Sequence, residues 1–152
     1  MIILESIFVI IGVYLSIYVL YNMILLTAHF LIKEKELPVE NQTTRFAVFI
    51  PAHDEELLLP RLLESVAGIN YPAELFDVYV IADNCSDNTA VVSREMGVNV
   101  IERHDPENVG KGYAIRHAID KIDLDCYDAV FIVDADSVVN DALLSQLHAG
   151  LA

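Results

Sequence analysis

The sequence predicts an α/β fold: a Rossmann-like, mostly parallel sheet with flanking helices, preceded by one transmembrane helix. Two observations lead to this prediction. Short apolar runs alternate with helical segments of about ten residues over the last two thirds of the chain, which is the pattern of right-handed βαβ units. A nearly continuous apolar stretch of about thirty residues opens the chain.

The opening stretch has the length of a membrane span. Residues 7–26 carry no charge, and Ser16 and Asn22 are their clearly polar members. Twenty helical residues rise about 30 Å, which matches the hydrocarbon core of a bilayer. A cleaved signal peptide is the main alternative, but the basic start and the small-residue cleavage pattern are missing. A buried core helix is the other alternative, but apolar side chains occupy every face of the run.

The charges that follow this stretch predict its orientation. Lys33, Lys35 and Arg45 come after the run, and no lysine or arginine comes before it. The positive-inside tendency therefore places the C-terminal part in the cytoplasm. We expect residues 1–32 to form the transmembrane anchor, residues 33–44 a linker, and residues 45–152 the soluble domain.

Composition excludes several classes of protein. The chain has a formal net charge of −14 at pH 7, and most of it falls on residues 45–152. Such a surface repels phosphate backbones, so nucleic-acid binding is disfavoured. A phosphorylated small ligand can still bind if a divalent cation mediates. Cys85 and Cys126 are too few and too dispersed for a disulfide framework or a zinc cluster.

The elements of the soluble domain follow in regular order. Apolar runs predict strands over residues 46–50, which Pro51 ends, 76–82, 98–101 and 129–133. Helical periodicity predicts helices over residues 57–66, 87 or 88 to 96, 112–122 and 141–151. Gly68 and Gly97 lie behind the first two helices. The expected apolar face of the third helix is formed by Ala114, Ile115, Ala118, Ile119 and Ile122.

Parallel sheets bind ligands beyond the carboxyl ends of their strands. The four predicted strand ends are followed by residues 51–56, 83–87, 103–111 and 134–137, and most of the unusual chemistry of the chain lies there. We therefore expect these loops to form one site.

The fourth loop carries the most specific functional signal of the four. Asp134 and Asp136 flank the small Ala135 at the end of an apolar strand. Two carboxylates so close repel each other unless a cation compensates, and Mg²⁺ or Mn²⁺ takes carboxylate and phosphate oxygens. The alternative is a helix cap and a solvated turn.

The first two loops offer polar contacts. Asp83 ends its strand, where its carboxylate can accept hydrogen bonds from a base or ribose, whereas residues 84–87 are interpreted as a polar turn in which Asp87 caps the next helix. In the first loop, Ala52 allows close backbone approach, and His53 or Glu55 is expected to touch a sugar or base. The acidic residues 54 and 56 precede a predicted helix and are assigned a structural role, in which their charge favours the N-terminal end of the helix dipole.

The third loop resembles a phosphate-binding turn. Gly110 and Gly112 flank Lys111 at a predicted helix N-terminus, where main-chain N–H groups and an ammonium suit a diphosphate. Neither the GxxxxGK[ST] spacing of a Walker A loop nor a GxGxxG motif is present.

Together these segments resemble the family 2 glycosyltransferases, which have the A-type nucleotide-sugar-binding fold and include cellulose, chitin and hyaluronan synthases. The P-x-x-N-E motif of that family is similar to residues 51–55, with Asp54 in place of Asn. The D-D-G-S-x-D loop is similar to residues 82–87, with Ala82 in place of the first Asp. The N-x-G-K-x-x-A segment is similar to residues 108–114, and the D-x-D motif to residues 134–136.

The resemblance implies transfer of a sugar from a nucleotide-diphosphate donor, usually UDP-linked, to a glycan or lipid-linked acceptor with inversion at the anomeric carbon. It implies that Asp83 contacts the base, Lys111 the diphosphate, and Asp134 the ribose or metal, while Arg103 assists. Asp136 would hold the Mg²⁺ or Mn²⁺ that neutralises the leaving diphosphate.

The family pattern is not complete in this sequence. Family members place an acidic general base further along, and no residue after Asp136 matches that motif, so we expect the base beyond Ala152 and an incomplete fold. One alternative is a non-catalytic, truncated nucleotide-binding fragment. Another is a haloacid dehalogenase-like phosphatase, because residues 134–138 fit D-x-D-x-[TV] with Asp134 as phosphoryl nucleophile. That motif normally ends the first strand of its domain.

Overall fold

The computed structural model describes residues 2–31 and 42–151. The chain divides into two compact units, Met1–Glu36 and Leu37–Ala152, and each is described by itself. Residues 33–41 of the predicted linker lie outside the described residues.

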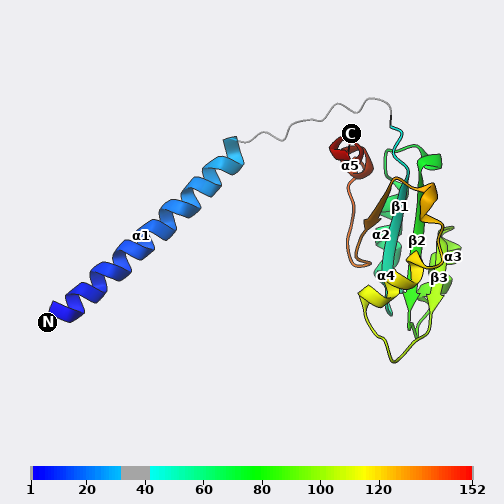
Figure 1. Cartoon of the computed structure of the whole chain (residues 1–152), viewed down its shortest axis with the longest axis horizontal. Coiled ribbons are helices and arrows are strands. Elements are labelled where there is room, and N and C mark those ends of the chain that lie inside the picture. Colours follow the sequence, from blue (N-terminus) through cyan, green and yellow to red (C-terminus); the bar gives the residue numbers. More distant parts are fainter. Residues whose placement is uncertain (1, 32–41, 152) are drawn as a thin grey trace. The chain divides into compact units, whose positions relative to one another are not determined.

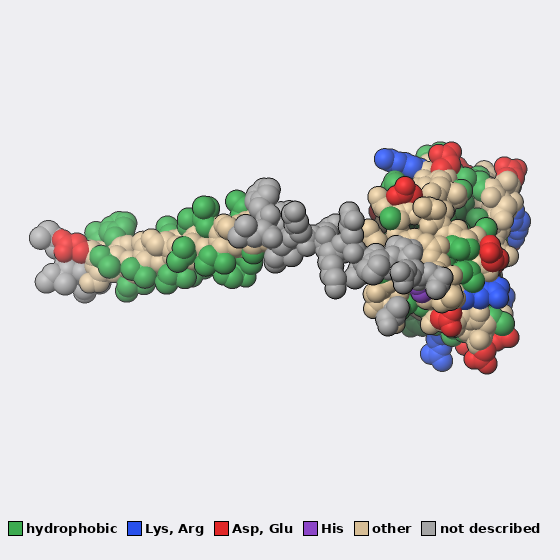
Figure 2. Space-filling model, turned by 90° about the horizontal axis from the view of Figure 1, so that it is seen from above, with side chains coloured by type: hydrophobic (Ala, Val, Ile, Leu, Met, Phe, Trp, Pro, Cys, Tyr) green, Lys and Arg blue, Asp and Glu red, His purple; other side chains and the backbone are tan. Residues whose placement is uncertain are grey.

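The first unit is the single helix α1 (Ile2–Leu31). Its segment Leu4–Ala28 is long and apolar enough to cross a membrane by length and composition, two properties that a signal sequence shares. Figure 2 shows hydrophobic side chains along the visible face of α1 and an acidic side chain near its N-terminal end.

Three polar side chains of α1 bond to the main chain of their own helix. Ser16 Oγ donates to the carbonyl of Gly12 at 2.8 Å, and Thr27 Oγ1 donates to the carbonyl of Met23 at 2.7 Å. Asn22 Nδ2 makes the corresponding bond one turn back, at 2.8 Å. Such bonds satisfy polar groups where no water is available, so these residues are compatible with a hydrocarbon environment.

The second unit contains a four-stranded parallel sheet, which confirms the predicted fold class (Figure 1). Its strands are β1 (Phe46–Ala52), β2 (Phe76–Asp83), β3 (Asn99–Arg103) and β4 (Ala129–Ile132), in the order β3-β2-β1-β4. The chain builds outward from β1 to β3 and then returns to the other side of β1. The strand order therefore reverses between β1 and β4, which is where such sheets bind ligands.

Helices cover both faces of the sheet. The helices α2 (Leu59–Ala67), α3 (Thr89–Glu95) and α5 (Leu143–Leu151) join one side, and α4 (Lys111–Ile119) lies on the other (Figure 1). Short 3₁₀ turns at Ala73–Leu75 and Leu124–Cys126 precede β2 and β4.

Strand β1 is buried on both faces. Phe46, Val48 and Ile50 pack toward α2 and α5, whereas Ala47 and Phe49 pack toward α4. A strand that is covered on both sides has a continuous apolar run rather than an alternating one, and this is why the sequence pattern predicted it well.

The predicted end of β1 at Ile50 is wrong, because the strand continues through Pro51 to Ala52. The Phe49 carbonyl accepts from Val133 N–H on the β4 side, at 3.0 Å. Pro51 lies two residues further along the strand, so its backbone nitrogen points to the same neighbouring position. Pairing of β1 with β4 has already ended there, at Phe49. The missing N–H of Pro51 interrupts no ladder, and β1 stays paired with β2 as far as Ala52.

Two helix predictions also need correction. Helix α2 begins at Leu59 rather than at residue 57, with Pro60 in its first turn, and Leu57 and Leu58 are exposed. Proline suits a first turn because its missing N–H would have no helical partner there. In α4, Ile119 of the expected apolar face is 45% exposed. The other boundaries differ by about a turn or less, which is usual for helix and strand ends.

Residues just before the predicted domain boundary at residue 45 already contact the domain. Gln42 Nε2 donates to Ser145 Oγ at 3.0 Å, and Thr44 Oγ1 lies 2.6 Å from His148 Nδ1. Tyr71 donates its hydroxyl to the Thr44 carbonyl at 2.8 Å. Residues 42–44 are thus part of the packed unit and tie α5 to the start of β1.

Candidate functional site

The carboxyl ends of the strands meet at one edge of the sheet, and a cavity of about 170 Å³ opens there. Ligand pockets usually measure about 300–1,000 Å³, so this one has room for a ring-sized group. Three of the four predicted loops and the first turn of α4 line it, through Pro51, Ala52, His53, Asp83, Val109, Gly110, Lys111 and Ala114.

Asp83, the last residue of β2, is held by a buried ion pair. Its Oδ1 accepts from Arg103 Nη1 at 2.6 Å and from Asn84 Nδ2 at 3.1 Å. The side chains of Asp83 and Arg103 are each only 7% exposed. Within residues 42–151, no side chain or main-chain group donates to Asp83 Oδ2. One oxygen of this carboxylate is therefore committed, and one is open.

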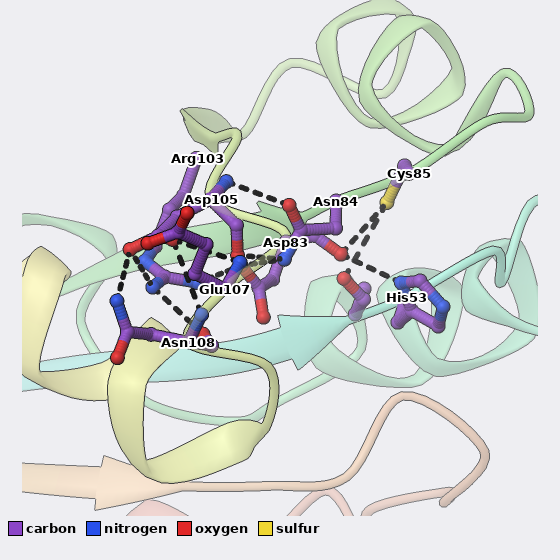
Figure 3. Close-up of polar contacts among 9 residues, drawn as sticks. His53, Asp83, Asn84, Cys85, Arg103, Asp105, Glu107 and Asn108 are labelled. Carbon is purple, nitrogen blue, oxygen red and sulfur yellow. Dashed lines mark hydrogen bonds and ion pairs between the residues drawn. The ribbon is translucent and has the colours of Figure 1, made fainter.

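Arg103, the last residue of β3, connects the second and third loops. Its Nη2 donates to Asp105 Oδ2 and to the Asn108 carbonyl, both at 2.8 Å (Figure 3). Its guanidinium carbon lies 5.8 Å from the centre of the Tyr113 ring, in cation–π range. Arg103 is buried by these contacts and does not line the cavity.

His53 places its ring beside the cavity. The ring Nδ1 lies 2.7 Å from the Asp83 carbonyl oxygen, which makes it the donor of that hydrogen bond (Figure 3). This bond fixes the Nδ1-protonated tautomer and leaves Nε2 as the other polar atom of the ring. Ala52, just before it, is 3% exposed and presents only backbone and a methyl group.

The acidic residues of the first loop bond to the second loop, a role that their assignment to the helix dipole did not include. No acidic residue lies in the first turn of α2. Asp54 Oδ1 instead accepts the main-chain N–H of Ser86 at 2.6 Å, and Glu56 Oε2 accepts that of Asn88 at 2.8 Å. These bonds join the first loop to the second. The Ser86 N–H holds the pKa of Asp54 below its usual range.

The second loop has structural contacts as well. Asp87 Oδ1 accepts the N–H of Thr89, the first residue of α3, at 2.9 Å, and Asp87 Oδ2 accepts from the main chain of Glu56 at 3.0 Å. The N-cap of α3 is Asn88, so Asp87 lies one residue before the cap, where it accepts the first N–H of the helix. Burial raises the pKa of the Cys85 thiol, which keeps it protonated at neutral pH.

The Gly-Lys-Gly turn opens α4 at the cavity wall. Gly110 precedes the helix with φ +127°, a conformation that glycine adopts without strain. Lys111 is the first residue of α4, and its ammonium contacts the carboxylate of Asp134. This ion pair brings the fourth loop to the other three.

Asp134 and Asp136 lie in an exposed turn just beyond β4. Ala135 between them is 5% exposed and packs into the core, so the two carboxylates stand out on either side of it. The Asp134 carbonyl accepts the N–H of Ser137 at 3.0 Å. In the described part of the chain, Asp136 has no ion-pair or hydrogen-bond partner.

The structure thus brings the predicted residues together in part. Those that line the cavity are Ala52, His53, Asp83 and Lys111. Those near it but outside its lining are Arg103, behind Asp83, and Asp134, beside Lys111. Glu55 lies with the acidic residues of the first loop in a separate surface hollow.

Sequence reasoning missed a connection between the second and third loops. The main-chain N–H of Asp105 donates to Asn84 Oδ1 at 2.7 Å, and Asn84 Nδ2 donates to the Asp105 carbonyl at 3.1 Å. The Asp105-Pro106 pair is a turn signal that could have drawn attention to this residue. Nothing in the sequence indicates its pairing with Asn84.

Comparison with known proteins adds the family. The model of "Glycosyl transferase family 2" matches residues 47–151, which include all four strand-end loops. The chain belongs to glycosyltransferase family 2. The predicted resemblance is therefore confirmed, and by resemblance the protein is a glycosyltransferase.

Individual relatives agree with this assignment. The chain is 31% identical over 108 residues to a probable glycosyltransferase, YdaM, of Bacillus subtilis (strain 168), a match that covers 61% of this chain and 25% of YdaM. Among solved structures, the mannosyltransferase PcManGT of Pyrobaculum calidifontis, in complex with GDP-Man and Mn²⁺, is similar with a TM-score of 0.65 and 21% identity over 82% of this chain and 37% of that one.

A second solved structure gives the same fold. S. aureus TarS 1-349 in complex with UDP-GlcNAc is similar with a TM-score of 0.56 and 25% identity, over 69% of this chain and 30% of that one. The chain spans about a quarter of the length of YdaM and about a third of these two structures.

Proposed function

We propose that this glycosyltransferase chain forms the donor site for a UDP-linked sugar, in a metal-dependent, inverting transfer to a glycan or lipid-linked acceptor. The observation that carries the proposal is the convergence of strand-end loops on one cavity. Asp83 and Lys111 line it, and Lys111 reaches Asp134 of the fourth loop. The ligands in the TarS and PcManGT complexes, UDP-GlcNAc and GDP-Man, are nucleoside-diphosphate sugars and support the donor class.

Lys111 is proposed to bind the diphosphate. It lines the cavity, and it is the first residue of the nine-residue helix α4. Positive charge and unpaired N–H groups at a helix N-terminus together favour an anionic ligand. Gly110 and Gly112 on either side add no side chain that would hinder a phosphate.

Asp83 is proposed to contact the base, and its geometry favours uracil over guanine. Arg103 and Asn84 occupy Oδ1, so Oδ2 is the oxygen left to accept within the described unit. Uracil offers a single imide N–H on this edge, whereas guanine offers two adjacent N–H donors. Guanine's two donors would have to share this one oxygen, whereas the single uracil N–H would have it to itself, and the poorer geometry of shared hydrogen bonds costs affinity. His53 and Ala52 are proposed to complete this wall.

Asp134 and Asp136 are proposed to hold Mg²⁺ or Mn²⁺. The fit is supported by two exposed carboxylates just beyond β4, one of which, Asp134, already accepts a cationic partner, the ammonium of the cavity-lining Lys111. When bound, such a cation supplies Lewis-acid neutralisation of the leaving diphosphate. Mn²⁺ in the PcManGT structure supports a divalent ion of this kind. Arg103 is assigned the role of holding Asp83, and Glu55 a contact to the sugar.

The general base of the inverting reaction is not assigned to a residue of this chain. We propose further that α1 anchors the protein in a membrane and that the domain lies on the cytoplasmic side. The length and composition of α1 support the anchor, and Lys33, Lys35 and Arg45 support the orientation.

The test is calorimetric titration of UDP into the full chain in detergent, with and without Mn²⁺. We expect binding that Mn²⁺ strengthens, and we expect Asp136→Ala to remove that strengthening. Asp141→Ala removes another exposed carboxylate, one that does not line the cavity, and should leave the titration unchanged. Absence of UDP binding by the folded wild-type chain would contradict the proposal. GDP binding as tight as UDP binding would contradict the assignment of the base.

A further inference from the structure

Asp105 accepts four hydrogen bonds at the start of the third loop (Figure 3). Its Oδ2 accepts from Arg103 Nη2 at 2.8 Å and from Asn108 Nδ2 at 3.0 Å. Its Oδ1 accepts the main-chain N–H groups of Asn108 at 3.1 Å and Glu107 at 3.2 Å. Both carboxylate oxygens are therefore engaged, one with a buried cation and one with the backbone of the loop.

The main chain of Asp105 is also fixed. It exchanges two hydrogen bonds with the Asn84 side chain, in the way that two peptide groups pair in a sheet. Asn84 has φ +53°, a left-handed conformation that asparagine tolerates better than most residues. The same Nδ2 also donates to Asp83 Oδ1 at 3.1 Å. Asn84 therefore links Asp83 directly to the beginning of the third loop.

Neither Asp105 nor Asn84 lines the cavity, but Asn84 contacts Asp83, which does line it, and Asp105 contacts Arg103, the buried partner of Asp83. Arg103 lies between Asp105 and Asp83 and contacts both carboxylates. On the other side, the segment from Asp105 runs through Asn108 to Gly110 and Lys111. Asp105 is thus the point at which the proposed base-binding side and the proposed phosphate-binding side meet.

We propose that Asp105 is a positioning residue of the donor site, which fixes Arg103 against Asp83 and, through the same carboxylate, fixes the turn that presents Lys111. This inference rests on the proposed function. A side chain that orients the groups in contact with a ligand changes affinity without touching the ligand, typically by about 10–100-fold in metal sites.

The chemistry of the carboxylate suits this role. All four groups that face it are donors, so an ionised acceptor satisfies them and a neutral amide cannot. The hydrogen bond from the Asn108 side chain, together with that residue's N–H and the charge of Arg103, holds the pKa of Asp105 below its usual range. The carboxylate is therefore ionised at neutral pH, which is the form that accepts all four hydrogen bonds.

The test compares three probes on the full chain in detergent with Mn²⁺: UDP, uridine and inorganic pyrophosphate. In Asp105→Asn we expect UDP to bind about ten-fold more weakly, and we expect uridine and pyrophosphate each to lose affinity. A role confined to the loop would weaken pyrophosphate alone, so the loss of uridine affinity distinguishes positioning from local structure.

Two further variants control this comparison. Asp123→Asn changes another aspartate that accepts a main-chain N–H two residues on, that of Asp125, before β4. It should leave all three affinities unchanged. Asn84→Gly keeps a residue that tolerates the positive φ and deletes the side chain that pairs with Asp105. This variant should weaken the binding of both uridine and pyrophosphate, and it tests the positioning role of Asp105 even if Asp105→Asn does not fold.

The outcomes separate this inference from the function on which it rests. If the folded wild-type chain binds none of the three probes, both are overturned. If the wild-type chain binds UDP and the folded variants bind all three probes as tightly, the role of Asp105 is overturned and the donor site stands.

Discussion

The buried ion pair between Asp83 and Arg103 is the residue-scale feature on which the site most depends. Removing one partner of a buried pair leaves the other charge without compensation, which costs about 3–5 kcal/mol. We expect Arg103→Met to lower the free energy of unfolding by about that amount, measured by urea denaturation followed by circular dichroism.

The chain contains a matched control for this prediction. Arg94 and Glu102 form an ion pair whose side chains are 52% and 60% exposed. Exposed pairs contribute about 0–1 kcal/mol, so Arg94→Met should change stability little. Equal losses in both variants would show that burial of the Asp83–Arg103 pair has no special effect.

The pKa of Asp54 gives stability a dependence on pH. Its folded-state pKa lies below the ordinary value of 3.8, chiefly because of the hydrogen bond from Ser86 N–H. A lowered folded pKa stabilises the protein above the unfolded value, and this stabilisation is lost as pH falls through the folded pKa. We expect wild type to be more stable than Asp54→Asn at pH 7 and the difference to shrink below pH 3.8.

Urea midpoints measured from pH 7 downward check this expectation. Asparagine accepts the φ of +54° at this position, so the variant changes charge with little strain. Asp141→Asn, an exposed aspartate with no side-chain bond in the described unit, serves as control. A difference between wild type and Asp54→Asn that stays constant with pH would refute the role given to the charge.

At the scale of elements, helix α4 is set close to the sheet by two alanines. Ala114 and Ala118 are fully buried and pack on Ala47, Phe49 and Ile81. Larger side chains there would force the helix outward, and overpacking of this kind typically costs about 1–3 kcal/mol. Because Lys111 begins α4, the same displacement moves the proposed phosphate-binding group.

We therefore expect Ala118→Leu to lower stability by about 1–3 kcal/mol and to weaken UDP binding as well. Thermal unfolding and calorimetry on the same preparation measure the two effects. Ile119→Ala alters the next, 45% exposed residue and should change stability by no more than about 0.5 kcal/mol. Unchanged stability and UDP affinity in Ala118→Leu would mean that α4 does not pack closely enough on the sheet for a larger side chain to displace it.

Strands, helices and the positions of the four loops could be predicted because each depends on local apolar patterning. The contacts within the loops could not. Asp54 and Asn84 bond across loops in left-handed conformations that no periodicity encodes. The ion pair of Lys111 with Asp134 joins residues that only the strand order brings together.

At the scale of the whole molecule, the position of the domain relative to a membrane can be tested with a native thiol. Cys126 is exposed in the second unit, whereas Cys85 is half-buried and its pKa is raised by burial. We expect a membrane-impermeant maleimide to label Cys126 in inside-out vesicles and not in sealed right-side-out vesicles. Labelling of intact right-side-out vesicles would contradict the cytoplasmic assignment.

Cys126→Ser is the control: because Cys85 is half-buried, this variant should lose the labelling expected in inside-out vesicles. Retention of the full chain in the membrane fraction after an alkaline carbonate wash tests the anchor separately. Release by that wash would show that α1 does not span the bilayer.

The contact between the Lys111 ammonium and the Asp134 carboxylate gives donor binding the character of an exchange of partners. Each charge already has a counter-charge before any ligand enters. Under the proposed assignments, a cation arriving alone would leave the ammonium without its partner, and a diphosphate arriving alone would leave the carboxylate without its own. When both enter, each side chain gains a new partner, so the two ligands assist each other's binding, and by linkage the assistance is equal in both directions.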